Sequence, residues 1–161
     1  MNTRTFALVF GILFLVVGIA GFVPGLVTYG GPVADTAPDA APMAEVIHTH
    51  GYLLGLFPVN ALHNLFHVAW GIFGIAAYRG LTGARVFARA TAIVYGLLTV
   101  IGLIPGLNTL FGLLPLYGHD VWLHAVLALI AAYFGFARPA EAEVVTTTDR
   151  TAAPLGTGRG H

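Results

Sequence analysis

The sequence contains no cysteine and no lysine, and only 9% of its 161 residues carry a charge. The absence of cysteine excludes disulfide bonds, thiolate metal ligands and cysteine nucleophiles. Soluble domains carry about 25% charged residues, so this chain has too few charges to cover a surface in contact with water. The net charge is zero, which leaves no basic footprint for nucleic acid, and we expect no nucleic-acid partner.

Apolar residues make up 57% of the chain and gather in four long runs. A helix needs about 20 apolar residues to cross a hydrocarbon layer of about 30 Å. Helices satisfy their own backbone groups in lipid, so these runs predict membrane-spanning helices and make the bilayer the first expected partner. We place the spans at residues 6–23, 59–78, 88–104 and 121–137, within a membrane domain of residues 1–138.

The segments outside the spans differ in composition. The loop at 24–58 is rich in Pro, Gly and Ala, which is typical of irregular structure. In its second part we expect a short interfacial helix at 44–56. Residues 139–161 contain TTT and GTGRGH and are predicted to form a disordered cytoplasmic tail.

All the arginines near the spans fall on one side of the predicted membrane domain, and neither 24–58 nor 105–120 contains one. Positive residues in short loops mark the cytoplasmic face. The pattern therefore predicts a multi-pass protein with both termini in the cytoplasm and two loops outside. The arginines are Arg4, Arg79, Arg85, Arg89 and Arg138.

Two phrases occur twice, in the same order. GFVPGL at 21–26 returns as GLIPGL at 102–107, and LLGLFPVN at 53–60 returns as LFGLLPLY at 110–117. One interpretation is shared helix-ending chemistry of Gly and Pro. The other, which we favour, is a duplicated helix pair. The fold predicted is then an all-α four-helix membrane bundle of two parallel repeats, related by a pseudo-twofold axis along the membrane normal.

The second phrase of each half leads into a polar constellation. His63 and His67 are four residues apart and share one helix face. The repeat places Asp120 and His124 at the equivalent positions of the fourth span, so the four side chains would face one another across the axis. Further polar residues flank them and are expected to support the site; these are Asn60, Asn64, Tyr117 and His119.

Three interpretations of this constellation remain open. The side chains could hydrogen-bond across helices and tie the second span to the fourth. His63, His67, Asp120 and His124 could bind Zn²⁺ or another first-row divalent ion, because an i, i+4 histidine pair is a familiar ligand spacing. His67 and His124 could instead ligate a b-type haem from two different helices.

The stretch LLGLFPVNALHNLFHVAWGIFGI resembles the signature region of a bacterial membrane family known as a domain of unknown function (DUF4383). The resemblance is densest in the pattern PVN-x-x-H-N-x-x-H, which begins at Pro58. It implies a four-helix membrane fold and supplies no activity. The second half departs from the pattern, with Tyr117, Asp120 and Val121 in place of the two asparagines and the first histidine.

We therefore expect a small, non-enzymatic protein of the bacterial cytoplasmic membrane with a structural or interaction role, as a homo-oligomer or within a larger membrane complex. The first alternative is a metal- or haem-binding protein that uses the histidines of the second and fourth spans. The second alternative is an oligomeric transporter of small solutes.

Overall fold

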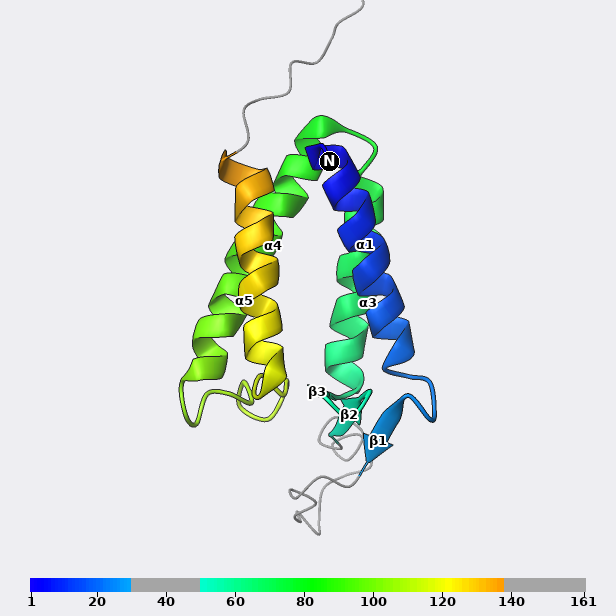
Figure 1. Ribbon diagram of the computed structural model, residues 1–161, viewed down its shortest axis with the longest axis vertical. Helices are drawn as coiled ribbons and strands as arrows, with labels where there is room; N and C mark the ends of the chain where they lie inside the picture. Colours follow the sequence, from blue (N-terminus) through cyan, green and yellow to red (C-terminus); the bar gives the residue numbers. More distant parts are fainter. Residues whose placement is uncertain (30–49, 138–161) are drawn as a thin grey trace, which may run out of the picture.

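The computed structural model describes residues 1–29 and 50–137, and four α-helices hold most of these residues (Figure 1). A mostly helical fold with four helices is thereby confirmed. Three of the helices, counting the last with its extension, are long and apolar enough to span a membrane, and α3 is apolar but shorter. The helices are α1 (Thr3–Ala20), α3 (Ala61–Ala77), α4 (Leu81–Leu103) and α5 (His119–Ala132), which a π-helix, η1 (Tyr133–Ala137), extends.

All four helices begin at positions that differ from the predicted spans, by two or three residues in α1, α3 and α5 and by more in α4. α4 starts at Leu81, seven residues before the predicted span, because a helix tolerates the arginines of its first turns where they reach the interface. α3 starts only at Ala61, since Asn60 provides a cap that the hydropathy pattern does not show. Its side-chain oxygen accepts a hydrogen bond from the backbone N–H of His63 at 2.8 Å.

A small antiparallel sheet, which the sequence did not predict, lies at one end of the helices. Its strands are β1 (Val27–Tyr29), β2 (Gly51–Leu53) and β3 (Phe57–Val59), in the order β1-β2-β3. Residues 50–56 therefore form strand and turn where we predicted part of an interfacial helix. The remainder of that helix, 44–49, and the predicted tail, 139–161, lie outside the described residues.

The helices are arranged as two hairpins. α1 packs along α3, and α4 packs along α5 (Figure 1). The N-terminus, the α3–α4 turn and the end of η1 lie at one end of the molecule, and the sheet and the loop after α4 lie at the other. Close approach inside the first hairpin depends on glycine, because a Cβ at Gly11 would lie 2.6 Å from the backbone nitrogen of Ile75.

Between the hairpins lies a core of aromatic rings. The ring of Phe6 stacks on that of Phe134 with centroids 4.7 Å apart, which joins α1 to η1. Further along, the rings of Phe14 on α1 and Tyr95 on α4 lie 5.1 Å apart. These contacts bury the rings almost completely and hold the two hairpins together.

An arginine joins the helices of each hairpin at the end that carries the N-terminus. Arg4 donates from Nε to the backbone oxygen of Tyr78 at 3.0 Å, and its guanidinium lies over the ring of the same tyrosine. Arg89 donates from Nε to the backbone oxygen of Gly135 at 2.9 Å and lies over the ring of Phe136. Each arginine thus satisfies a carbonyl at the end of the neighbouring helix.

Candidate metal centre

Three histidines from the two hairpins meet at one point inside the protein. His63 and His67 lie one turn apart on α3, and His124 comes from α5. One ring nitrogen of each lies within 4.8 Å of a ring nitrogen of the other two. Their side chains are only 2%, 6% and 1% exposed. The sequence prediction that the histidines of the second and fourth spans face one another agrees with this arrangement.

Two asparagines position α3 for this meeting. Asn60 caps the helix with its side-chain oxygen and donates from Nδ2 to the backbone oxygen of Leu113, in the loop that leads to α5, at 2.8 Å. Asn64 donates from Nδ2 to the backbone oxygen of Gly21 at the end of α1, also at 2.8 Å. The start of α3 is therefore tied to both hairpins, and the two residues support the cluster from outside it.

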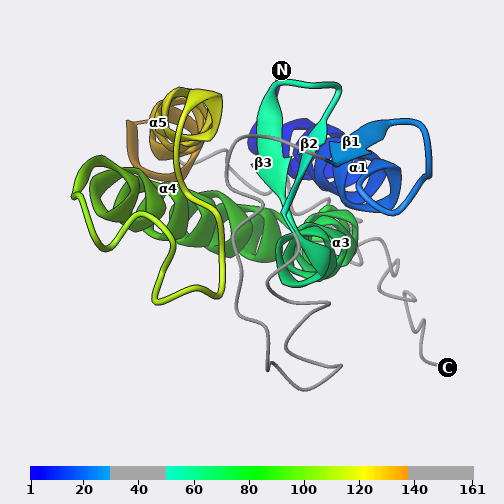
Figure 2. The same cartoon turned by 90° about the horizontal axis from the view of Figure 1, so that it is seen from below.

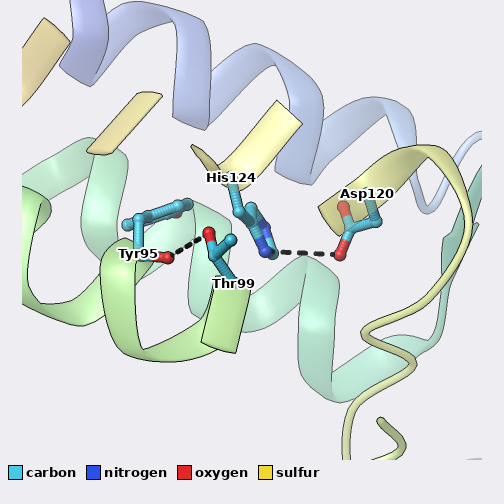
Figure 3. A network of polar contacts seen from close by, with 4 residues as sticks. All are labelled: Tyr95, Thr99, Asp120 and His124. Carbon is cyan, nitrogen blue, oxygen red and sulfur yellow. Dashed lines mark hydrogen bonds and ion pairs between the residues drawn. The ribbon is translucent and has the colours of Figure 1, made fainter. Parts of the chain in front are cut away.

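Asp120 lies beside the three histidines rather than among them. Its Oδ2 is 3.5 Å from Nδ1 of His124, one turn along α5 (Figure 3). Among the described residues, the possible ligand atoms that lie within 4.8 Å of one another come from the three histidines. No carboxylate oxygen of Asp120 belongs to this group. The four predicted ligands are thus neighbours, with the carboxylate on the outer side of one imidazole.

Aromatic rings enclose the cluster. The imidazoles of His63 and His67 stack with centroids 4.6 Å apart, and the ring of Phe14 stacks on His67 at 5.8 Å. The ring of Tyr95 meets that of His124 edge to face at 4.9 Å. Thr99 donates from Oγ1 to the backbone oxygen of Tyr95 at 2.7 Å (Figure 3). Sequence reasoning missed this tyrosine, although a hydroxyl inside an apolar span was a signal that could have found it.

Several polar atoms of the site are buried in apolar surroundings and have few protein partners. The Nδ1 atoms of His63, His67 and His124 and the Oδ2 atom of Asp120 are all buried and make no hydrogen bond of good geometry to the described residues. Backbone groups of Pro58 and His63 lie near the first two imidazoles, and the Asp120 oxygen faces the His124 nitrogen at 3.5 Å. Buried polar atoms in native proteins almost always have a partner. Three buried imidazoles that converge on one point have the donor atoms that a transition-metal ion requires.

The two remaining predicted residues do not join the histidines. His119, the first residue of α5, is exposed. Tyr117 is half-buried, and burial together with the neighbouring hydroxyl of Tyr52 raises the pKa of Tyr117 to about 12. Its phenol therefore stays protonated at neutral pH and belongs to the contact between the loop and β2.

The fold and the site define a mostly helical protein with helices able to span a membrane and a buried cluster of three histidines. Over residues 4–137 the chain matches the family model described as Domain of unknown function (DUF4383), and it belongs to that family. The resemblance seen in the sequence is thus confirmed. Comparisons with curated proteins and with solved structures found no match. The family description states no biochemical function and names no ligand, cofactor or transported solute.

Proposed function

We propose that this membrane protein binds one divalent first-row transition-metal ion through His63, His67 and His124, and that the ion joins its two helical hairpins. The observation that carries the proposal is the mutual approach of three buried ring nitrogens, within 4.8 Å, from α3 and α5. Two of the imidazoles come from one hairpin and the third from the other. A shared ion would therefore add a bond between the hairpins to their apolar contacts and to the hydrogen bonds from Asn60 to Leu113 and from Trp70 to Thr91.

The donor set suits such an ion. Imidazole nitrogen is a good ligand for Zn²⁺, Cu²⁺, Fe²⁺ and Ni²⁺, whereas Mg²⁺ and Ca²⁺ prefer oxygen. A zinc–nitrogen bond of about 2.0–2.1 Å places the nitrogens of a tetrahedral site about 3.3 Å apart. Binding would therefore draw the three nitrogens, now within 4.8 Å of one another, closer together. Three protein ligands leave one position for water or for a further ligand.

The packing supports a single ion better than a haem. A porphyrin held by His67 and His124 would have to lie between their rings. Phe14 stacks on the first of these rings, and Tyr95 packs against the second. Both aromatic side chains are almost completely buried, so a macrocycle would displace them from the core.

The same proposal includes the architecture predicted from the sequence: a closed bundle of two repeats in the bacterial cytoplasmic membrane, with both termini inside. Gly25 and Gly106 occupy the same position in the first repeated phrase and have φ angles of 91° and 88°. The carbonyls that accept the two arginine hydrogen bonds belong to Tyr78 and Gly135, which occupy equivalent positions in the second and fourth spans. These matches support a common origin of the halves.

Elemental analysis of the full-length protein, purified in detergent without a histidine tag or chelators, tests metal binding. We expect about one equivalent of a transition metal per chain. The metal should be lost in His67→Ala and His124→Ala, and retained in His119→Ala, whose histidine is exposed and outside the cluster. A Soret band in the absorption spectrum would show that the site binds a haem instead of a single ion. A wild-type protein that takes up neither after growth with added metals would overturn the proposal.

Single cysteines test the orientation, because the chain contains none of its own. His119→Cys should react with a membrane-impermeant maleimide on intact cells, whereas Arg79→Cys should react only after lysis. Both positions are exposed and lie at opposite ends of the molecule. The reverse pattern of labelling would mean that the termini lie outside.

A further inference from the structure

Two exposed apolar residues at the tips of the outer turns adopt an unusual backbone conformation, which the half-buried Leu110 also adopts with φ 45°. Leu54 has φ 52° and a side chain that is 64% exposed, and Phe111 has φ 59° and a side chain that is 80% exposed. Residues with a side chain rarely enter the left-handed region, because Cβ approaches the following carbonyl oxygen. The exposed side chains gain little from protein contacts that would offset this unfavourable conformation.

The two turns are alike in a second respect. Each apolar residue precedes a glycine that also has a positive φ, 70° at Gly55 and 85° at Gly112. Leu54 and Phe111 occupy the same position in the second repeated phrase. Both halves of the chain therefore present a large apolar side chain at the same point of the same turn.

The described segments around these turns have the composition of an interfacial surface rather than of a loop in water. Residues 21–29, 50–60 and 104–118 contain no arginine, aspartate or glutamate. Trp122, one turn from the start of α5, is 66% exposed at the same end. Tryptophan at this depth is typical of the boundary between headgroups and acyl chains.

Both turns also extend toward the sides of the molecule, where lipid would lie. Figure 2 shows the β2–β3 hairpin running across the end of the helices, between α1 and α5, with its turn at the edge of the molecule. The loop between α4 and α5, which carries Phe111, extends on the opposite side. Both tips thus leave the helices sideways, where the lipids of the outer leaflet would surround the protein.

We infer that Leu54 and Phe111 insert into the outer leaflet beside the helices, so that lipid at the boundary between headgroups and acyl chains covers both turns. The inference rests on the membrane orientation proposed above and is independent of metal binding. Contact with lipid supplies the apolar surroundings that the protein does not provide for these side chains. Anchoring of the turn at Phe111 would also restrict the motion of the loop in which the Leu113 carbonyl accepts the hydrogen bond from Asn60.

Spin labels can measure the depth of each tip. Leu54→Cys and Phe111→Cys are labelled with a nitroxide and reconstituted in vesicles of phosphatidylethanolamine and phosphatidylglycerol. Power saturation then compares collisions with oxygen, which enters the bilayer, and with a water-soluble nickel chelate present on both sides. Arg79→Cys is the reference in water, and Leu129→Cys, 72% exposed on α5, is the reference among the acyl chains.

We expect the ratio of oxygen collisions to nickel collisions to be severalfold higher at both tips than at position 79. The depth calculated from this ratio should be shallower than that of position 129. If the nickel chelate reaches the two tips as readily as it reaches position 79, while position 129 remains in lipid, the inference is wrong. The prediction that the helices span the membrane would not be affected. Immobilised labels shielded from both reagents would also overturn the inference, in favour of a second protein copy. Phe111→Trp, tested for added fluorescence quenching by brominated lipid, gives the same decision if a cysteine variant does not fold.

Discussion

The Oδ2 atom of Asp120 lies 3.5 Å from Nδ1 of His124, one turn apart on the same buried face of α5. A carboxylate in contact with one ring nitrogen of a histidine orients the imidazole and leaves the other nitrogen to bind a metal. In the proposed site, Asp120 is therefore a positioning residue for the third ligand. This role differs from the direct ligation that its position in the repeat suggested.

Asp120→Ala is expected to weaken metal binding about 10–100-fold, the usual effect of losing a carboxylate that orients a ligand. Competition with a chromogenic chelator measures this change. The visible absorption of bound Co²⁺ should keep the same shape, because the ligands remain three imidazoles. A changed Co²⁺ spectrum would show that Asp120 is itself a ligand, and His124→Ala should remove the spectrum altogether.

Asn60→Ala should lower the thermal stability of the protein in detergent more than Asn2→Ala does. Both residues cap a helix, and loss of a cap costs about 1 kcal/mol. Asn60 also donates to the carbonyl of Leu113, whereas the Asn2 side chain accepts a hydrogen bond from Thr5 in its own first turn. Circular dichroism during heating measures the difference. Asn60→Ser should recover only the capping part, and equal losses at the two positions would contradict the proposed link between the hairpins.

Gly11→Ala and Gly96→Ala make a matched pair of helix substitutions. A Cβ at Gly11 would lie 2.6 Å from the backbone nitrogen of Ile75, so α1 and α3 must separate, and we expect a loss of about 1–3 kcal/mol. Nothing lies within 4 Å of a Cβ at Gly96. There alanine should be neutral or stabilise the helix by up to about 1 kcal/mol. Unfolding by denaturant in mixed micelles measures both, and similar effects would count against close packing of the first hairpin.

Arg89→Gln should destabilise the protein, because it removes the hydrogen bond to the carbonyl of Gly135 and the contact with Phe136. Leaving a part-buried carbonyl without a partner costs about 1 kcal/mol, toward the lower end of the range for buried groups. Arg79→Gln makes the same change of charge at an exposed residue and should alter stability by less than about 0.5 kcal/mol. Arg89→Lys should rescue little, since an ammonium group cannot reproduce the guanidinium geometry. Equal melting temperatures for the two glutamine variants would argue against this role.

Much of the helical structure was predictable because it depends on local sequence. Apolar runs of sufficient length define where helices lie in lipid, and an i, i+4 spacing places His63 and His67 on one face wherever α3 packs. The repeated phrases also predicted which histidines would be neighbours. Hydropathy did not reveal the start of α3, because a single capping side chain, Asn60, decides it.

The sheet and the enclosure of the site could not be predicted in the same way. β1 pairs with β2 across a long intervening segment, as in the register of Thr28 with Tyr52, and no local pattern records such a pairing. Tyr95 and Phe14 surround the histidines only because α1 and α4 meet between the hairpins.

A mostly helical fold with helices able to span a membrane, the family and the pair of histidines on α3 could all be predicted from the sequence, since composition and helix periodicity are properties of neighbouring residues. The repeated phrases also predicted His124 as a neighbour of that pair, but the approach of all three ring nitrogens to within 4.8 Å is a property of the folded chain. That approach depends on the packing of one hairpin against the other, whereas the contact of Asp120 with His124 follows from their i, i+4 spacing on α5. Contacts between residues more than 50 positions apart are settled by the shapes of the packed surfaces, not by the spacing of residues along the chain.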